Sequence, residues 1–316
     1  MYYLGIDLGG INIAAAVVDE AGQIVGRDSR PTPHASGEVV ADHMAAAARA
    51  AAGQAGISLD EVASLGVGSP GAIDPQAGMV LKWYNLGFDQ VPLSALLRER
   101  LGLEVFLEND ANAAALGEYA AGAGRGSASM VAITLGTGVG GGAVLGGKLY
   151  TGFNYAGMEI GHFVLEYNGR PCKCGRRGCF EAYCSATALI KRTREEMERH
   201  PDSLLWQAAG GSLDRVEGRT AFTAMAQGDA IARAVVEEYT NYLGCGVASL
   251  INILQPEVVC IGGGVSNAGE TLLAPVRAIV DREDYARSSL SRARVVRAQL
   301  GNDAGIIGAA LLPRFR

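Results

Sequence analysis

The sequence predicts an α/β protein built from a duplicated unit, and three observations carry this prediction. Strand-like apolar segments alternate with helical patterns through the first half of the chain. Residues 4–18 align with residues 131–145 at one constant offset, which places Gly9 over Gly136. Glycine contributes 44 of 316 residues, and its clusters follow apolar segments without the three-residue period of collagen. The alternative is a chance match between two hairpins in a chain rich in Gly and Ala.

The first half begins with two antiparallel strands on either side of a glycine corner, and a turn at residues 21–23 follows them. The strands expected in this half cover residues 2–7, 11–19, 62–74 and 104–110. The expected helices cover residues 37–56, 93–102 and 111–122. The first helix is rich in Ala and ends at Gly53 or Gly56, and the second ends at Gly102.

A Gly-rich stretch at residues 121–129 predicts a domain boundary or hinge. After it we expect strands within 130–150, 257–262 and 293–298, and helices at 229–254, 272–280 and 303–312. The predicted domains are a small α/β domain at 1–118 and a large one at 119–300. The C-terminal helix at 301–316 is expected to pack back on the small domain, and the catalytic cleft is expected between the two domains.

Composition excludes several classes of protein. The chain is 49% hydrophobic and 19% charged with a net charge of −6, so it is globular, and no basic run points to nucleic acid. The first residues lack the features of a signal peptide, and no long apolar run suggests a membrane span. We therefore expect a cytoplasmic protein whose six cysteines are reduced and serve as metal ligands or core residues.

Two glycine motifs are misleading. Gly136, Gly138 and Gly141 satisfy G-x-G-x-x-G, but the dinucleotide-binding fingerprint needs a helix next, and a strand is predicted there. The segment ending at Lys148 resembles a P-loop, but Leu149 replaces the hydroxyl residue that would bind magnesium. Both functions are rejected.

One histidine and three cysteines have the spacing of a zinc site. His162, Cys172, Cys174 and Cys179 form a Cys₃His set, and glycine turns allow a short loop to surround one ion. Four protein ligands leave no open position, so the zinc is expected to be structural. The remaining cysteines, Cys184, Cys245 and Cys260, are expected in the core.

Several acids could contact a ligand. Asp110 follows Asn109 where a strand meets a helix start, and the helix dipole favours its ionised form there. The alternative is that Asp110 only caps the helix. Glu159 and Glu181 lie on either side of the predicted zinc loop, where they could bind hydroxyl groups.

These segments together resemble the ROK family of sugar kinases. The matching pieces are GIDLGG, GSPGAID, LENDANAAALGE, ITLGTGVGGG, EIGH with CKCGRRGCFE, IGGGVS and GNDAGIIGAA, spread from Tyr3 to Leu312. The resemblance implies the duplicated actin-like or hexokinase-like (ribonuclease H-like) ATPase fold. It also implies ATP-dependent phosphorylation of a hexose at its primary hydroxyl, with glucose preferred because the acids and the short zinc loop look most like those of the glucokinase members.

The resemblance also implies residue roles. Asp110 would be the general base for in-line attack on the γ-phosphoryl group, with magnesium on the phosphates. The sugar hydroxyls would be bound by Gly71, Asn85, Asn109, Asp110, Glu159, His162 and Glu181. The nucleotide would be bound by Asp7, Gly9, Gly10, Asn12, Thr137, Gly138, Gly263 and Gly264. One nitrogen of His162 would hold zinc while the other meets the sugar.

One residue departs from the family pattern. Ile11 stands where the first phosphate corner usually has Thr, and the lost hydroxyl would weaken nucleotide binding by roughly 1.5–3 kcal/mol. The alternatives left open are kinases for N-acetylglucosamine, N-acetylmannosamine, mannose or fructose, and a sugar-binding pseudokinase. A sugar-responsive repressor would need a helix-turn-helix domain ahead of the first strand, which begins at Tyr2. The donor, ATP or polyphosphate, and the expected homo-oligomer, a dimer or tetramer, also stay open.

Overall fold

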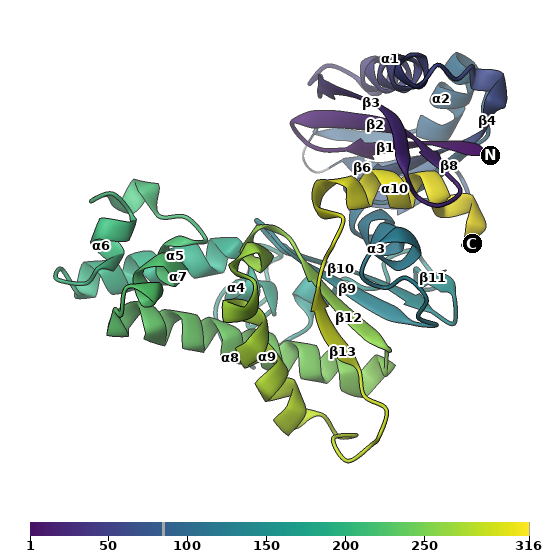
Figure 1. Ribbon diagram of the computed structural model, residues 1–316. Helices are drawn as coiled ribbons and strands as arrows, with labels where there is room; N and C mark the ends of the chain where they lie inside the picture. Colours follow the sequence, from purple (N-terminus) through teal and green to yellow (C-terminus); the bar gives the residue numbers. More distant parts are fainter. Residues whose placement is uncertain (84–85, 316) are drawn as a thin grey trace. The chain divides into compact units, whose positions relative to one another are not determined.

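The computed structural model describes residues 1–83 and 86–315, and Figure 1 traces them from the N-terminus to the C-terminus. They form two compact units, which we describe separately. Unit 1 comprises residues 1–132, 142–158 and 299–316, and unit 2 comprises residues 133–141 and 159–298. The chain passes between the units at residues 132–133, 141–142, 158–159 and 298–299, whereas the sequence placed a boundary near residue 118. The domain bounds 1–118 and 119–300 therefore stay a prediction.

The duplication predicted from the aligned segments is visible in the strand order. The first five-stranded sheet has the order β3-β2-β1-β4-β8, and the second has the order β11-β10-β9-β12-β13. The strands of the first sheet are β1 (Tyr2–Leu8), β2 (Asn12–Asp19), β3 (Ile24–Pro31), β4 (Val62–Ser69) and β8 (Val105–Asn109). Those of the second are β9 (Met130–Leu135), β10 (Val139–Leu145), β11 (Lys148–Tyr150), β12 (Val258–Gly262) and β13 (Arg294–Arg297).

The sequence offset holds at the corners of both sheets. β1 ends at Leu8 and β9 at Leu135, while β2 begins at Asn12 and β10 at Val139, so each corner lies at the same offset in its sheet. β1 and β2 are antiparallel, and β1 and β4 are parallel. Strands β10 and β11 stand where the dinucleotide fingerprint and the P-loop would each need a helix, as the sequence predicted.

Small residues let helices lie close to the first sheet. Helix α1 (Gly37–Ala55) presents buried alanines to the sheet, and the absence of a side chain at Gly26 lets β3 approach the Ala51 carbonyl. The Ser36 hydroxyl accepts a hydrogen bond from Val39 N–H at the start of α1, and Gly56 ends the helix with a left-handed φ of 70°. The predicted helix is therefore confirmed together with one of its two expected stops.

The opposite face of the first sheet carries the C-terminal helix α10 (Ala304–Leu311), as Figure 1 shows in yellow. A side chain at Gly5 would collide with the Ile306 carbonyl, and one at Gly66 would collide with the Ala309 carbonyl. Helix α3 (Asp110–Ala121) packs on α10 at equally short range, because a Cβ on Gly308 would meet the Ala113 carbonyl. Gly308 therefore lets α3 and α10 pack closely.

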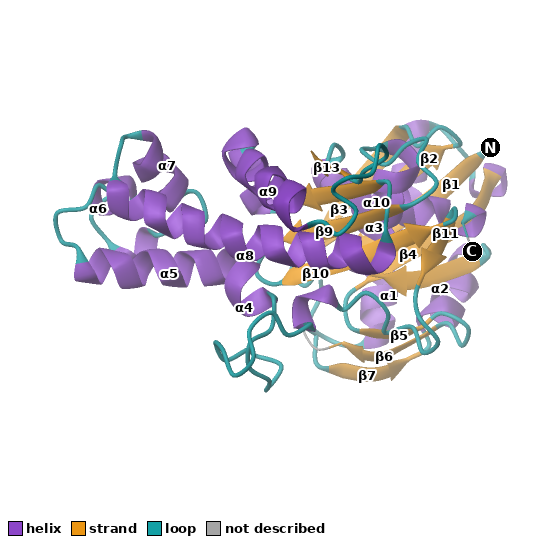
Figure 2. Cartoon of the chain, turned by 90° about the horizontal axis from the view of Figure 1, so that it is seen from below, coloured by secondary structure: helices purple, strands orange, loops and turns teal. Residues whose placement is uncertain are grey.

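The remaining elements were predicted only in part. Figure 2 shows a small sheet of β5 (Ala72–Asp74), β6 (Met79–Trp83) and β7 (Phe88–Val91), which belongs to unit 1 and was not predicted. The predicted helices include α2 (Leu93–Leu101), α8 (Ala230–Leu254) and α9 (Glu270–Glu283). The helices that were not predicted are α4 (Glu181–Cys184), α5 (Ala186–Arg199), α6 (Leu205–Ala208) and α7 (Thr220–Ala226). Among the described residues, no helix has both the length and the apolar character needed to cross a membrane.

Candidate active site

Two carboxyl groups lie close together in unit 1. Asp7 is near the end of β1, and its side chain lies over Gly305 of α10, where a Cβ would be only 2.7 Å from Oδ2. Burial raises the pKa of Asp7 from 3.8 to about 6, and the charge of Asp110 adds to the rise. The two acids are therefore near enough to repel each other when both are ionised.

The second acid begins helix α3. The Asn109 side chain accepts hydrogen bonds from the N–H groups of Ala111 at 2.9 Å and Asn112 at 3.2 Å, so Asn109 and not Asp110 is the N-cap. Burial raises the pKa of Asp110 above its usual range, although the Ala111 N–H and the Asn109 side chain act in the opposite direction. The alternative that Asp110 only caps the helix is thereby answered, because a neighbour does the capping.

A buried acid holds this segment from behind. Glu108 is 2% exposed, and its Oε1 accepts hydrogen bonds from Asn109 N–H at 3.0 Å and from the Asn112 side chain at 3.1 Å. These hydrogen bonds fix the backbone at the junction between β8 and α3. The sequence analysis missed Glu108, and its place inside an apolar strand next to Asn109 was the available signal.

The first phosphate corner is the turn from Gly9 to Ile11. Gly9 N–H donates to the Asn12 carbonyl at 2.8 Å, and the Thr32 hydroxyl donates to the Gly9 carbonyl at 2.8 Å. Gly10 lies within the same turn, and Asn12 begins β2 with its amide on Ser29. The Ile11 side chain is 85% exposed, so it contributes little to the core.

Of the sugar-binding residues predicted from neighbouring loops, one is described. Gly71 has φ of 98°, and a side chain there would collide with the Lys82 carbonyl, so the position requires glycine. Asn85 lies outside the described residues.

The second phosphate corner, residues 136–138, is held by the segment that follows the predicted zinc loop. Ala186 N–H donates to the Gly136 carbonyl at 2.8 Å, and the Thr187 hydroxyl donates to the Thr137 carbonyl at 2.8 Å. Thr187 was missed by the sequence analysis, since only the fold brings it to this corner. A hollow of about 270 Å³ opens beside Thr137 and Glu181, and Lys173 and Lys191 line it.

The adjacent glycines Gly263 and Gly264, which follow β12, differ in how much space surrounds them. Gly263 has φ of 83°, and a side chain there would collide with the Leu135 backbone, so packing on β9 already requires glycine. A Cβ on Gly264 would meet no heavy atom within 4 Å. The backbone at Gly264 is therefore open to a ligand.

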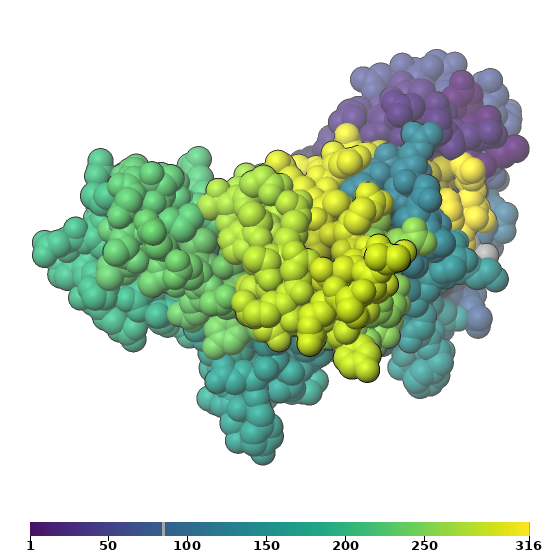
Figure 3. All heavy atoms as spheres, turned by 60° about the horizontal axis from the view of Figure 1, so that its bottom comes forward, coloured from purple at the N-terminus to yellow at the C-terminus, as the bar shows by residue number. Residues whose placement is uncertain are grey.

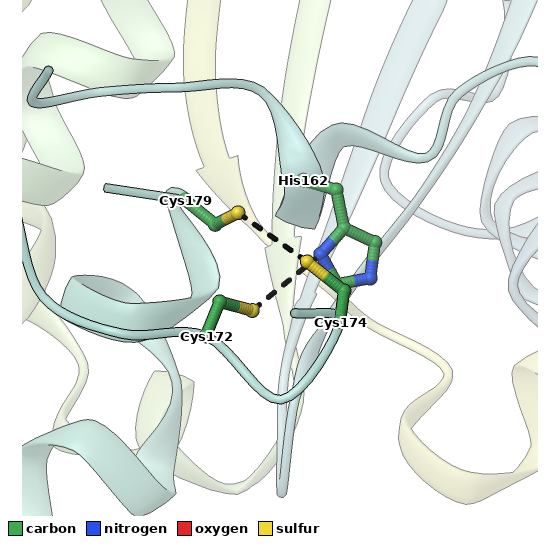
Figure 4. A group of neighbouring side chains, drawn as sticks. All are labelled: His162, Cys172, Cys174 and Cys179. Carbon is green, nitrogen blue, oxygen red and sulfur yellow. Dashed lines mark hydrogen bonds between the residues drawn. The ribbon is translucent and has the colours of Figure 1, made fainter. Parts of the chain in front are cut away.

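His162, Cys172, Cys174 and Cys179 converge in unit 2, and Figure 4 shows their side chains pointing toward one another. Their ligand atoms all lie within 4.8 Å of one another. Cys172 Sγ is 3.8 Å from His162 Nδ1, and Cys174 Sγ is 3.6 Å from Cys179 Sγ. Zinc–sulfur bonds of about 2.3 Å in a tetrahedron would place sulfurs about 3.8 Å apart, so the donor set fits zinc.

The loop that carries these ligands stands out from the surface of unit 2 as the teal projection in Figure 3. His162 ends a 3₁₀ helix (Ile160–His162) that begins just after the exposed Glu159. Because Nδ1 faces Cys172, Nε2 is the nitrogen left for another partner.

The three cysteines outside the Cys₃His group differ in their burial. Cys184 and Cys260 are buried as expected, but Cys245 is exposed, so its assignment to the core was wrong. Cys245 lies on α8, whose buried face includes Gly244, Gly246 and Val247 instead. The apolar run around it therefore does not identify the buried side of the helix.

Comparison with known proteins places the chain in a family. The ROK family model matches residues 3–315, and the chain belongs to the ROK family. It is 41% identical to a glucokinase of Thermotoga maritima over 99% of this chain and 97% of that protein. It is 36% identical to an N-acetylmannosamine kinase of Shigella boydii over 99% of this chain and 98% of that protein.

Comparison with solved structures supports the same family and shows the fold. The crystal structure of a ROK family glucokinase from Streptomyces griseus in complex with glucose and AMPPNP matches with a TM-score of 0.82 and 38% identity, covering 99% of each chain. The protein is therefore a sugar kinase with the actin-like, hexokinase-like fold that the motifs predicted.

Proposed function

We propose that the protein transfers the γ-phosphoryl group of ATP to the primary hydroxyl of glucose, which yields glucose 6-phosphate and ADP. The similarity to glucokinases over nearly the full chain supports the choice of glucose. The observation that carries the chemistry is the partly buried Asp110 carboxyl at the start of α3, whose pKa is raised by desolvation. A raised pKa makes a carboxylate a better proton acceptor near neutral pH.

In this mechanism Asp110 takes the proton of the C6 hydroxyl as the oxygen attacks the γ-phosphorus in line. The bond from the γ-phosphorus to the β–γ bridging oxygen breaks, and ADP leaves with that oxygen. Asn109 caps α3 and Glu108 holds the strand end, so Asp110 keeps a fixed direction. Positioning of this kind supplies much of the rate enhancement in phosphoryl transfer.

The remaining roles are part of the same proposal. The sugar would be bound by Gly71, Asn85, Asn109, Glu159, His162 and Glu181. The nucleotide would be bound by Asp7, Gly9, Gly10, Asn12, Thr137, Gly138, Gly263 and Gly264. Magnesium bound with ATP would offset phosphate charge near Asp7, and zinc on the Cys₃His group would fix the loop that carries His162.

The sequence similarity to an N-acetylmannosamine kinase supports a second candidate substrate. N-acetylglucosamine, mannose and fructose remain further candidates, and polyphosphate is a second candidate donor. We also propose that the protein acts in the cytoplasm in carbohydrate metabolism as a homo-oligomer, a dimer or tetramer.

A panel of sugars tests the proposal. Release of ADP would be followed with glucose, mannose, fructose, N-acetylglucosamine and N-acetylmannosamine, and the site of phosphorylation would be read by NMR. We expect the highest kcat/KM with glucose and phosphate on the C6 oxygen. A higher kcat/KM with N-acetylmannosamine would move the assignment to the second candidate, and no turnover with any sugar and either donor would refute both.

A further inference from the structure

The carboxylate of Glu181 contacts the second phosphate corner directly. Its Oε2 accepts a hydrogen bond from Val139 N–H at 3.0 Å. The same oxygen lies where a Cβ of Gly138 would be, so glycine at that position makes room for the acid. The carboxylate therefore occupies part of the backbone surface that a phosphate group would approach.

Glu181 is also fixed with respect to the metal-ligating group. It begins α4 two residues after Cys179, and its Oε1 lies 3.8 Å from Cys172 Sγ. The Phe180 ring before it is fully buried and stacks on Phe163 at 4.9 Å between ring centroids. The side chain thus starts from a rigid segment and ends on the phosphate corner.

The other contacts to this corner are of a different kind. Ala186 N–H and the Thr187 hydroxyl donate hydrogen bonds to the carbonyls of residues 136 and 137. Gly161 packs on the Val139 carbonyl, where a side chain would collide. These neutral groups hold the corner in place, whereas Glu181 adds a negative charge and occupies an N–H donor.

That charge opposes a nucleotide at the corner. A phosphate oxygen close to Gly138 would be repelled by the carboxylate and would compete with it for Val139 N–H. A sugar hydroxyl that donates a hydrogen bond to Glu181 would compete with Val139 for the same oxygen and draw the charge toward the sugar. The acid would then oppose phosphate less.

We propose that Glu181 is a positioning residue that makes nucleotide binding at the second phosphate corner depend on the sugar. This inference rests on the proposed function, because it takes glucose as the partner of Glu181. Without sugar the carboxylate closes the corner, and with sugar it releases the corner. By linkage, the nucleotide raises the affinity for the sugar by the same factor.

The test is calorimetric titration of ADP with magnesium into the full chain, with and without saturating glucose. We expect glucose to lower the Kd of wild type for ADP by about five-fold or more, the range of ordinary coupling between sites. Glu181→Gln keeps the size of the side chain but loses its charge. It should bind ADP more tightly than wild type without glucose, and its Kd should change less than two-fold when glucose is added.

A further variant serves as the control. Glu195→Gln removes an acid that lines the same hollow and pairs with Lys191 and Arg192 instead of with the corner. The coupling in Glu195→Gln should therefore be that of wild type.

The outcomes are separable. An unchanged Kd for ADP in Glu181→Gln without glucose, together with full coupling, would overturn the inference. If wild type does not bind glucose, the proposed function fails, and the comparison of the two proteins without sugar still decides whether Glu181 opposes the nucleotide. If Glu181→Gln does not fold, the Val139 amide resonance of wild type decides: it should shift with glucose alone, and a resonance that stays fixed would overturn the inference.

Discussion

The two halves of the duplicated fold carry the same three residues after their last strands, but the surroundings of those residues differ. Asn109, Asp110 and Ala111 lead from β8 into α3, while residues 302–304, again Asn, Asp and Ala, lead from β13 into α10. Burial raises the pKa of Asp110. Asp303 is instead paired with a cation, since its carboxylate lies 3.2 Å from the exposed guanidinium of Arg27. The same motif at a helix start therefore places an aspartate in both halves. The desolvation of Asp110 raises the pKa of that carboxyl in a way that suits proton transfer.

The segments between the hairpins and the parallel strands differ as well. In the first half, the Ala-rich helix α1 lies between β3 and β4, and the small sheet of β5–β7 comes only after β4. Both contribute to the core. In the second half, the segment after β11 carries the Cys₃His group and then α4–α8. The first half thus contains the partly buried acids Asp7 and Asp110, and the second half contains the Cys₃His group and the residues that contact the second corner.

The largest effect should come from exchanging the two aspartates for amides. Asp110→Asn should lower kcat by about 10²–10⁴, the usual contribution of a general base. Asp303→Asn should leave kcat within about two-fold, since its exposed ion pair is worth little. Steady-state kinetics with glucose and ATP measures both values of kcat. Equal losses in the two variants would contradict the claim that Asp110, unlike Asp303, takes part in proton transfer.

The second effect concerns stability and pH. The folded protein holds the Asp7 proton more tightly than the unfolded chain does, because its pKa is raised to about 6. Its contribution to stability is therefore greatest at low pH and is lost as pH rises from about 4 to about 6. Ionisation above that range costs up to about 3 kcal/mol, from two pKa units at 1.36 kcal/mol each.

Asp7→Asn should accordingly raise the free energy of unfolding by up to about 3 kcal/mol at pH 7.5 and by much less at pH 4.5. Urea unfolding at the two pH values measures this free energy. Asp303→Asn is the control, because it should not raise the free energy of unfolding at either pH. A gain of the same size at both pH values would show that ionisation of Asp7 is not the cause.

The third effect tests the metal-braced half. Cys174 is exposed, so Cys174→Ser removes a ligand with little loss of packing. We expect zinc content to fall from about one per chain and the Kd for glucose to rise about ten-fold or more, because zinc fixes the loop that carries His162. Cys245→Ser, at an exposed cysteine on α8, should change neither quantity. Full zinc content in Cys174→Ser would remove that residue from the ligand set.

The smallest effect concerns the first corner. Ile11→Thr restores the hydroxyl that is usual in the family. Because Ile11 is exposed, the substitution removes little packing from the core. The KM for ATP should fall about ten-fold, the effect of about 1.5 kcal/mol and the lower end of the range for one hydrogen bond to a charged group. Leu290→Thr replaces another fully exposed apolar residue and should leave the KM unchanged. An unchanged KM in Ile11→Thr would mean that the Thr hydroxyl is not needed at this corner.

Local signals predicted much of this molecule. The aligned segments identified both corners, and glycine stops identified the ends of α1 and α2, because turns and caps depend on a few adjacent residues. The strands β5–β7 were missed as a separate sheet because they are short and lack a clear alternation. The contact of Glu181 with Val139 joins residues 42 positions apart, so only the folded chain brings them together. Gly263 was assigned to the nucleotide, whereas the backbone of β9 by itself requires glycine there.

The assignment of Asp110 as the base is tested most directly by the affinity of Asp110→Asn for glucose, measured by calorimetry beside its turnover. We predict a Kd for glucose within about three-fold of wild type while kcat falls at least about 100-fold, because the carboxylate moves a proton more than it holds the sugar. Near-normal turnover, or a loss of glucose affinity as large as the loss of turnover, would contradict the assignment.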